Sequence, residues 1–428
     1  MNAISLAGIA GAVVLGYWRL EAGLFLALFL LPFLPTPANV LIALALATLE
    51  AGRRLAGREG HPCCSPSATP VDLPLLVFGL AVATAALASL APSSSLLALG
   101  MWVSCLAMFL LVARALKHPY QVRVIISALL LSSVAVAVIG IYQFAAGIET
   151  PSSWIDLKAS PSVTTRVYSV FDNSNMLAEY LAFLLPVTAW LAAATSSWAK
   201  RIVLLGILAV QSLSLLYTFS RGGWISALVA LVLLAWWRER RLFPVLLAGA
   251  ALAPLLLPGA ALERASTLAT LQDTSIKFRT SIWVAVIRLL RDYWPTGVGL
   301  GPGAFLRVYP DYLLAGTPAA HTHNLYLELV TEMGIPGLLA FLWLMRNLFL
   351  YVLPRPGDKG DSHLHGLAVA LLAGIAGQLV HGLTDNTWYS PKNLELFWIF
   401  AGLAIAARRL AALPAPEGDG PAPEGGHA

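Results

Sequence analysis

Long apolar stretches recur along the whole chain, and short polar segments separate them. A helix of about 20 apolar residues crosses roughly 30 Å of hydrocarbon, so these stretches are candidate transmembrane helices. We expect about twelve, at residues 3–18, 22–50, 73–90, 96–116, 122–144, 176–195, 201–219, 224–237, 242–257, 324–350, 364–383 and 394–410. The second stretch is long for one straight span and contains Pro32, Pro35 and Pro37, so it is either one kinked helix or two short ones.

The composition points the same way. Apolar residues make up 58% of the chain and charged residues only 11%, whereas a soluble protein carries roughly 25% charged residues. We therefore expect an all-α, polytopic membrane protein, with a single transmembrane domain over residues 1–413. Residues 414–428 are rich in Pro, Gly and Glu and are expected to form a disordered cytoplasmic tail.

The position of the basic residues indicates the orientation in the membrane, because Lys and Arg accumulate in short cytoplasmic connections. If the N-terminus is inside, alternate connections carry Arg53, Arg54 and Arg58, then Arg114, Lys117 and Arg123, then Lys200 and Arg201, then Arg238, Arg240 and Arg241, then Arg346, Arg355 and Lys359, and finally Arg408 and Arg409. The net charge of +5 is thus no sign of nucleic-acid binding. The outer side is then expected to carry the connections 145–175, 220–223, 258–323 and 384–393. We expect the chemistry to take place on that side as well.

The largest outer loop, residues 258–323 between the ninth and tenth spans, is rich in cations. They are Arg264, Lys277, Arg279, Arg288, Arg291 and Arg307. Long loops cross the membrane regardless of charge, so these cations call for another explanation, such as an anionic ligand. Residues 275–294 predict an amphipathic helix. Arg279 is expected to face the protein beside Trp283, while the other cations of this helix rest on lipid headgroups or bind a ligand. The alternative is that all four cations, Arg279 included, only anchor the helix to anionic lipid.

Two further outer segments have open interpretations. Residues 297–303 are rich in glycine, but without the strand and helix that flank a phosphate-binding loop they predict a tight connection. Arg221, in the turn Ser-Arg-Gly-Gly between two spans, either extends to the membrane interface or binds a ligand that approaches the neighbouring glycines closely.

The segment that begins the tenth span is the most informative. His321, His323 and Asn324 lie at the mouth of an apolar helix. A His-x-His pair suggests a metal, but no Asp, Glu or Cys stands directly beside it to complete a ligand set, so we expect no metal and no cofactor. A neutral imidazole, with a pKa of about 6.5, can take a proton from a sugar hydroxyl. Capping of the helix by the histidine is the alternative.

Two more outer polar residues are candidates. Asn175, or Ser174 beside it, is expected to start the sixth span. Asp385 is the acidic group of its outer connection. It either orients a histidine, pairs with an arginine, or only shapes a turn.

Together these motifs resemble the O-antigen ligase and O-antigen polymerase superfamily, multi-helix membrane glycosyltransferases of the GT-C class. The ligase motif is His, then Asn, Ser or Gln, nine residues, Gly, two residues and a small residue. It is matched here by His323, Asn324, Gly334 and Gly337. The Ser-Arg-Gly-Gly turn, the pair Arg279 and Trp283, and the Phe-x-Asn-x-Asn sequence at residues 171–175 are also similar to the family. The additional His321 departs from the pattern and leaves the choice of base between two histidines.

The resemblance implies a concrete reaction at the periplasmic face of the bacterial inner membrane. The donor would be a glycan on undecaprenyl pyrophosphate and the acceptor a sugar of the lipid A core. His323 would be the general base, and Arg221 and Arg279 would neutralise the departing pyrophosphate in an inverting, metal-independent transfer. Supporting roles would fall to His321, Asn324, Arg288, Asp385 and Asn175.

Three other functions remain open. A polymerase would use a second lipid-linked glycan as acceptor, and a protein O-oligosaccharyltransferase would use a protein. A transporter would carry ionisable groups near the middle of its spans. Here Glu179 and Glu328 lie near helix starts and the other polar groups collect in outer loops, which favours an enzyme.

Overall fold

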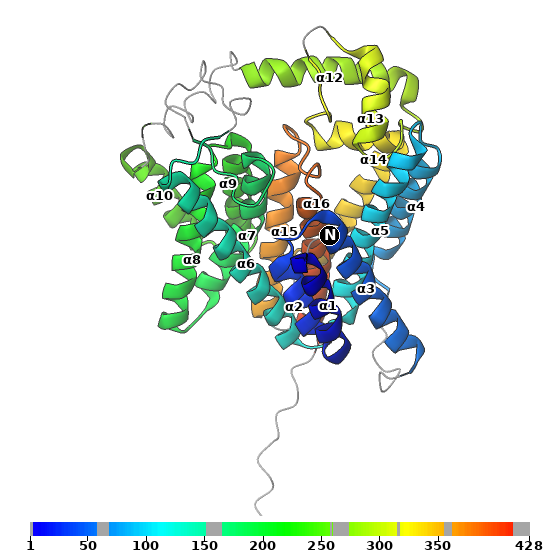
Figure 1. Ribbon diagram of the computed structural model, residues 1–428. Coiled ribbons are helices and arrows are strands. Elements are labelled where there is room, and N and C mark those ends of the chain that lie inside the picture. The colour runs from blue at the N-terminus through cyan, green and yellow to red at the C-terminus, as the bar shows by residue number, and fades with distance from the viewer. Residues whose placement is uncertain are drawn as a thin grey trace, which may run out of the picture.

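The computed structural model describes residues 3–57, 68–150, 165–256, 259, 274–314, 317–354 and 362–413. Its long helices are α1 (Ala3–Trp18), α2 (Leu20–Leu30), α3 (Thr36–Leu55), α4 (Asp72–Leu87), α5 (Pro92–Ala115), α6 (Pro119–Ala145), α7 (Ser174–Ala194), α8 (Trp198–Tyr217), α9 (Arg221–Trp237), α10 (Leu242–Leu256), α12 (Thr274–Tyr293), α14 (Leu325–Val352), α15 (Ser362–His381) and α16 (Pro391–Ala411). The described residues form no strand, so the all-α prediction is confirmed. Most helices run between two ends of the molecule, and α12 lies across one end (Figure 1).

Six of the described helices are long and apolar enough to cross a membrane. They are α5, α6, α7, α8, α14 and α15. The chain is therefore a multi-pass membrane protein. The other predicted spans are also helical, but α1, α2, α4 and α9 are shorter than 18 residues, so the total of about twelve spans stays a prediction.

Residues 22–50 form two helices that reverse direction, and not one kinked span. The turn between α2 and α3 is held by Asn39, whose Nδ2 donates to the carbonyl of Leu31 at 3.0 Å. Arg53, near the end of α3, donates to the carbonyls of Gly16 and Tyr17 at the end of α1. α1 therefore runs toward the end at which Arg53 lies. The predicted span order counted α2 and α3 as one span, and the side of the membrane on which the N-terminus lies stays a prediction.

Arginines of several short connections lie at one end of the molecule. There, Arg114 at the end of α5 pairs with Asp72 at 2.7 Å, and Arg409 at the end of α16 donates to the carbonyl of Leu116. We call this the basic end, and the opposite one, across which α12 lies, the α12 end (Figure 1). Arg58, Arg264, Arg355, Lys359 and the tail 414–428, which entered the predictions above, lie outside the described residues.

The centre of the bundle is formed by α7, α15 and α16, which are buried along most of their length. Most of their residues are apolar, as expected for helices that are buried on nearly all sides. Two glycines of α15 allow this close packing. A Cβ atom on Gly374 would lie 2.8 Å from the carbonyl oxygen of Phe183 in α7, and one on Gly377 would lie 2.5 Å from that of Ser226 in α9.

A small layer of helices covers the α12 end. The predicted amphipathic helix is present as α12, and it buries Ile282, Ala285, Val286 and Leu289. They pack against α13 (Pro302–Val308) and the 3-10 turn η4 (Tyr309–Tyr312). The described part of the large loop is thus a packed cap over the bundle.

The glycine-rich segment 297–303 forms the tight connection that its sequence predicts. Its backbone amides are used by α14: Val298 N donates to the carbonyl of Thr331 at 2.7 Å, and Gly301 N donates to the carboxylate of Glu332 at 2.7 Å. Opposite this segment α14 is kinked at Gly334, where φ is 69°. A Cβ there would lie 2.5 Å from the carbonyl oxygen of Pro295, so this position of the ligase-like motif requires glycine.

Candidate active site

The carboxylate of Asp385, between α15 and α16, joins three segments that are far apart in the sequence. Its Oδ1 lies 3.0 Å from Nδ1 of His323. Its Oδ2 lies 3.0 Å from a guanidinium nitrogen of Arg279 and 3.0 Å from Nδ2 of Asn175. Four residues that the sequence marks as candidates therefore form one cluster at the α12 end.

Asp385 is ionised within this cluster. Its side chain is only 7% exposed, and burial alone would raise the pKa of the carboxyl group. The Arg279 guanidinium and the His323 imidazole outweigh this effect and hold the pKa of Asp385 well below its usual range. Of the three interpretations above, Asp385 contacts both a histidine and an arginine, and it also accepts from the amide of Asn386 within its own turn at 3.0 Å.

Asn324 ties the histidine loop to the Asp385 turn. Its side-chain oxygen caps α14 by accepting from the amides of Tyr326 and Leu327, while its Nδ2 donates to the carbonyl of Leu383 at 2.8 Å. His323, immediately before it, has a backbone φ of 51°, in the left-handed region that non-glycine residues rarely adopt. This conformation is held by contacts on both sides, which fixes the imidazole beside Asp385.

The amphipathic helix α12 holds the histidine loop from the other side. The indole Nε1 of Trp283 donates to the carbonyl of Thr322 at 3.0 Å, and the amide of Thr322 donates to the carboxylate of Glu328 at 2.8 Å. Residues four apart share a helix face, so the anchoring of Trp283 brings Arg279 to Asp385. This geometry explains the spacing between that arginine and tryptophan.

His321 lies beside His323 but has a different environment. Its ring stacks on Tyr389 with 4.2 Å between centroids, and its Nδ1 accepts from the backbone amide of His323 at 3.2 Å. Burial, with a smaller contribution from the neighbouring His323 imidazole, lowers the pKa of His321 to about 3. His321 is therefore neutral at physiological pH, with its proton on Nε2 and its Nδ1 lone pair in use.

The sequence did not mark two residues that adjoin the cluster. Arg166 donates to the side-chain oxygen of Asn175 at 3.0 Å and to the carbonyl of Thr218 at 3.0 Å. His381, in the last turn of α15, is buried, and one of its ring nitrogens comes within 4.8 Å of the carboxylate of Asp385. Nothing in the sequence pointed to Arg166, which lies in a long connection without a motif. His381 could have been found, because it lies four residues before Asp385.

Arg221 and Arg288 are placed differently from Arg279. Arg221 is the first residue of α9, and the next residue, Gly222, packs so closely on the His381 ring that a Cβ atom would lie 2.3 Å from Nε2. Arg221 thus begins a helix that borders the cluster. Arg288 is exposed, and it lies nine residues beyond Arg279 on α12, roughly 13 Å along the helix axis. Arg288 is therefore not part of this cluster, so its expected supporting role there is not seen.

Two groups of side chains bring possible metal-ligand atoms within 4.8 Å of one another. One is His321, His323 and Asp385, and the other is Glu179, His381 and Asp385. Both groups share Asp385, whose two oxygens already accept from cationic and amide donors. A metal ion there would face the Arg279 guanidinium 3.0 Å from the same carboxylate. The donor set therefore fits a hydrogen-bonded ion-pair cluster better than a metal site.

A largely apolar cavity of about 930 Å³ lies beside the cluster. Residues of α3, α5, α14 and α16 line it, and Asn386 and Tyr389 border it from the Asp385 turn. Tyr389, which lines this cavity, also stacks on the ring of His321. An apolar chain can therefore bind within a short distance of the polar cluster.

Comparison with known protein families gives a match to the middle part of the chain. The O-antigen ligase family matches residues 203–342, about a third of the chain. The matched segment includes Arg221, Arg279 and His323, but it ends before Asp385. It confirms the resemblance stated above and supports an O-antigen ligase family assignment, which at family level means a ligase- or polymerase-type glycosyltransferase. No curated protein matches the chain.

Proposed function

We propose that this protein transfers a glycan from undecaprenyl pyrophosphate to a sugar hydroxyl of the lipid A core, at the periplasmic face of the inner membrane. The observation that carries the proposal is the ion-paired cluster of His323, Asp385 and Arg279. It combines a base and a fixed positive charge at the end of the bundle away from the basic connections. Basic connections are typically cytoplasmic, so this end would face the periplasm.

His323 is the general base in this proposal. Its Nδ1 donates to the ionised Asp385, which leaves the lone pair on Nε2 to accept a proton. The acceptor hydroxyl loses its proton to Nε2 while its oxygen attacks the anomeric carbon. The bond from that carbon to the pyrophosphate oxygen breaks, and the configuration inverts. His321 is a poorer candidate, because its Nδ1 already accepts from the amide of His323.

Arg279 and Arg221 would stabilise the departing pyrophosphate. Negative charge develops on the leaving oxygen, and fixed guanidinium groups oppose it without reorganising. The contact with Asp385 holds Arg279 in place, and a guanidinium has five N–H donors, more than that contact uses. Fixed cations would thus do what a divalent ion does in other transferases, and the reaction is expected to be metal-independent.

The apolar cavity beside Tyr389 supports a lipid-linked substrate. Its volume of about 930 Å³ would hold a segment of a hydrocarbon chain while the attached pyrophosphate reaches the arginines. Three side chains would keep the base and the arginine in position. Asn175 bonds to Asp385, Asn324 to the carbonyl of Leu383, and His321 to the amide of His323.

The direct test is to incubate the purified protein with a lipid-linked glycan and either lipid A-core or additional donor. Glycan attached to lipid A-core is the expected product. A chain lengthened on the lipid carrier would instead identify a polymerase, and absence of both products would reject glycan transfer in favour of functions such as transport.

Two variations of this assay test the mechanism. His323→Ala should lower the rate at least about 100-fold, the usual weight of general-base catalysis, while His321→Ala should cost less. Turnover should also persist in EDTA. Near-complete loss with EDTA, or an active His323→Ala variant, would reject the proposed chemistry.

A further inference from the structure

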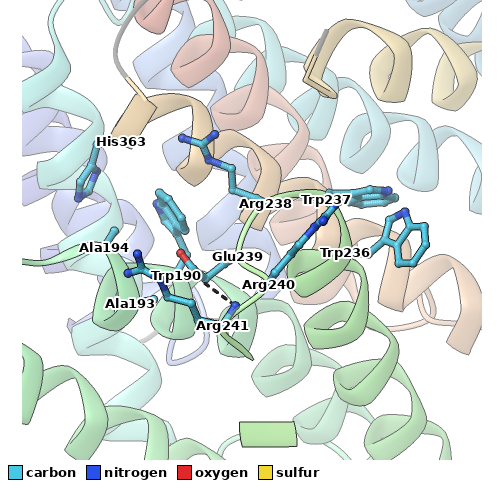
Figure 2. Close-up of a pocket in the computed structure, with 10 residues that line it drawn as sticks. All are labelled: Trp190, Ala193, Ala194, Trp236, Trp237, Arg238, Glu239, Arg240, Arg241 and His363. Carbon is cyan, nitrogen blue, oxygen red and sulfur yellow. Dashed lines mark hydrogen bonds and ion pairs between the residues drawn. The ribbon is translucent and has the colours of Figure 1, made fainter. Parts of the chain in front are cut away.

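A second pocket lies at the basic end, where the end of α7, the turn between α9 and α10, and the start of α15 meet (Figure 2). Its volume is about 570 Å³. The lining residues are Trp190, Ala193 and Ala194 of α7, residues 236–241, and His363 of α15. None of them belongs to the Asp385 cluster.

The pocket has a net positive charge and an aromatic wall. Arg238, Arg240 and Arg241 outnumber Glu239, which pairs with Arg241 at 3.8 Å. The guanidinium of Arg238 lies over the ring of Trp190, 5.5 Å from its centroid. Trp190 is only 5% exposed and therefore forms a fixed wall, whereas Arg240 and Arg241 are exposed.

The position of the pocket along α9 indicates the level of lipid headgroups. Trp236 and Trp237 end the apolar helix directly before the arginines, and tryptophan is enriched where hydrocarbon meets the polar interface. Exposed apolar side chains continue from the rim toward the middle of the bundle: Trp236 is 70% exposed, and Leu247 in α10 is 71% exposed. A ligand with both an anionic head and apolar chains fits this combination better than a free anion.

We propose that this pocket binds the phosphate headgroup of an anionic phospholipid, with the acyl chains along α9 and α10. Arginine binds phosphate oxygens through parallel N–H donors, and basic pockets between helices on the cytoplasmic side of a membrane are suited to anionic headgroups. The inference is independent of the proposed glycan transfer. The helices that form the pocket nevertheless carry Asn175, Arg221 and His381 at their other ends.

The experiment uses native mass spectrometry of the full-length protein in detergent. It is titrated with short-chain phosphatidylglycerol, with phosphatidylcholine of equal chain length, and with inorganic phosphate. Arg240→Gln/Arg241→Gln removes two exposed charges from the pocket. Arg123→Gln/Lys200→Gln is the matched control, because it removes two exposed charges from the same end, outside the pocket.

We expect phosphatidylglycerol to bind the wild-type protein at least about tenfold more tightly than phosphatidylcholine. Loss of two arginine contacts should weaken that binding by about tenfold or more, and the control variant should stay within about twofold of wild type. Equal weakening in the control variant would show a general basic surface and overturn the proposal. Equal binding of phosphatidylcholine would do the same, and displacement by inorganic phosphate at the lipid's own concentration would identify a free anion in place of the lipid.

Discussion

Arginine side chains line both ends of this molecule, but the two ends hold them differently. At the α12 end, Arg279 is partly buried and bonded to a buried carboxylate, which in turn holds an imidazole and an amide. At the basic end, Arg240 and Arg241 are exposed around a pocket with an aromatic wall, and Glu239, the acid that lines this pocket, lies on the same turn. One arrangement is fixed, and the other can adapt.

The difference indicates what each end is suited to do. Burying a charged cluster costs desolvation energy, and loss of one partner leaves the other charge buried and unpaired. Such a cluster is useful where charges must already be in position before a bond breaks. Exposed arginines need no such support and are better suited to a lipid surface of variable composition. Substitutions at the α12 end should therefore have much larger effects than equivalent substitutions at the basic end.

The largest effect is expected from Asp385→Asn. The shape of the side chain is kept, but the amide no longer accepts from both His323 and Arg279, and it favours the wrong tautomer of the imidazole. We expect the transfer rate to fall about 1000-fold or more, on the scale of such changes in other base–carboxylate pairs. Initial rates of glycan transfer by purified protein measure it.

Asp311→Asn is the matched control, because Asp311 is exposed at the same end of the molecule. Its rate should stay within about twofold of wild type. If Asp385→Asn kept more than a tenth of the wild-type rate, the carboxylate would have only a structural role. The α12 end would then not be a preorganised catalytic cluster that differs from the basic end.

Two arginines on the same helix sharpen the comparison. Arg279→Gln should lower the rate about 100-fold, since it removes a fixed cation at the proposed leaving group. Arg288→Gln, an exposed position on α12, should change the rate less than about threefold. The rate of Arg279→Lys should be little higher than that of Arg279→Gln, because a lysine lacks the planar guanidinium that contacts a carboxylate and a phosphate together. Equal losses in the Arg279 and Arg288 variants would point to lipid anchoring by the whole helix.

The rigidity of the α12 end extends to its backbone. Gly334→Ala should destabilise the protein by about 2–3 kcal/mol, because φ is 69° and the new methyl group would lie 2.5 Å from the Pro295 carbonyl oxygen. A Cβ atom added at Gly206, within α8, would have no neighbour within 4 Å. Gly206→Ala should therefore leave the stability unchanged or raise it slightly. Thermal unfolding in detergent compares them, and equal melting temperatures would mean that the kink relaxes freely.

The helices could be predicted from the sequence, because each apolar run carries its own local signal. The reversal between α2 and α3 could not, since Pro32, Pro35 and Pro37 fit a kink as well as a turn. The residue types of the cluster could also be named in advance. Their pairing could not, because Asp385 is 62 residues from His323 and 106 residues from Arg279 in the sequence. Arg166 was missed for the same reason: its partners, Asn175 and Thr218, become neighbours only through the packing of α7 and α8.

The smallest expected effect concerns pH and separates the two histidines. Burial lowers the pKa of His321 to about 3, while in the unfolded chain it is about 6.5. The neutral ring therefore contributes stability that is fully present above about pH 6.5 and is lost progressively as the pH falls toward 3, because the unfolded state then binds the proton first. Between pH 7.5 and pH 5 the loss is about 2 kcal/mol. His321→Asn keeps an acceptor for the amide of His323 without titrating, so the melting temperature of this variant should fall less over that range. Equal slopes for wild type and variant would mean that His321 has the same pKa in the folded and the unfolded protein, and its imidazole could then compete with His323 as the base.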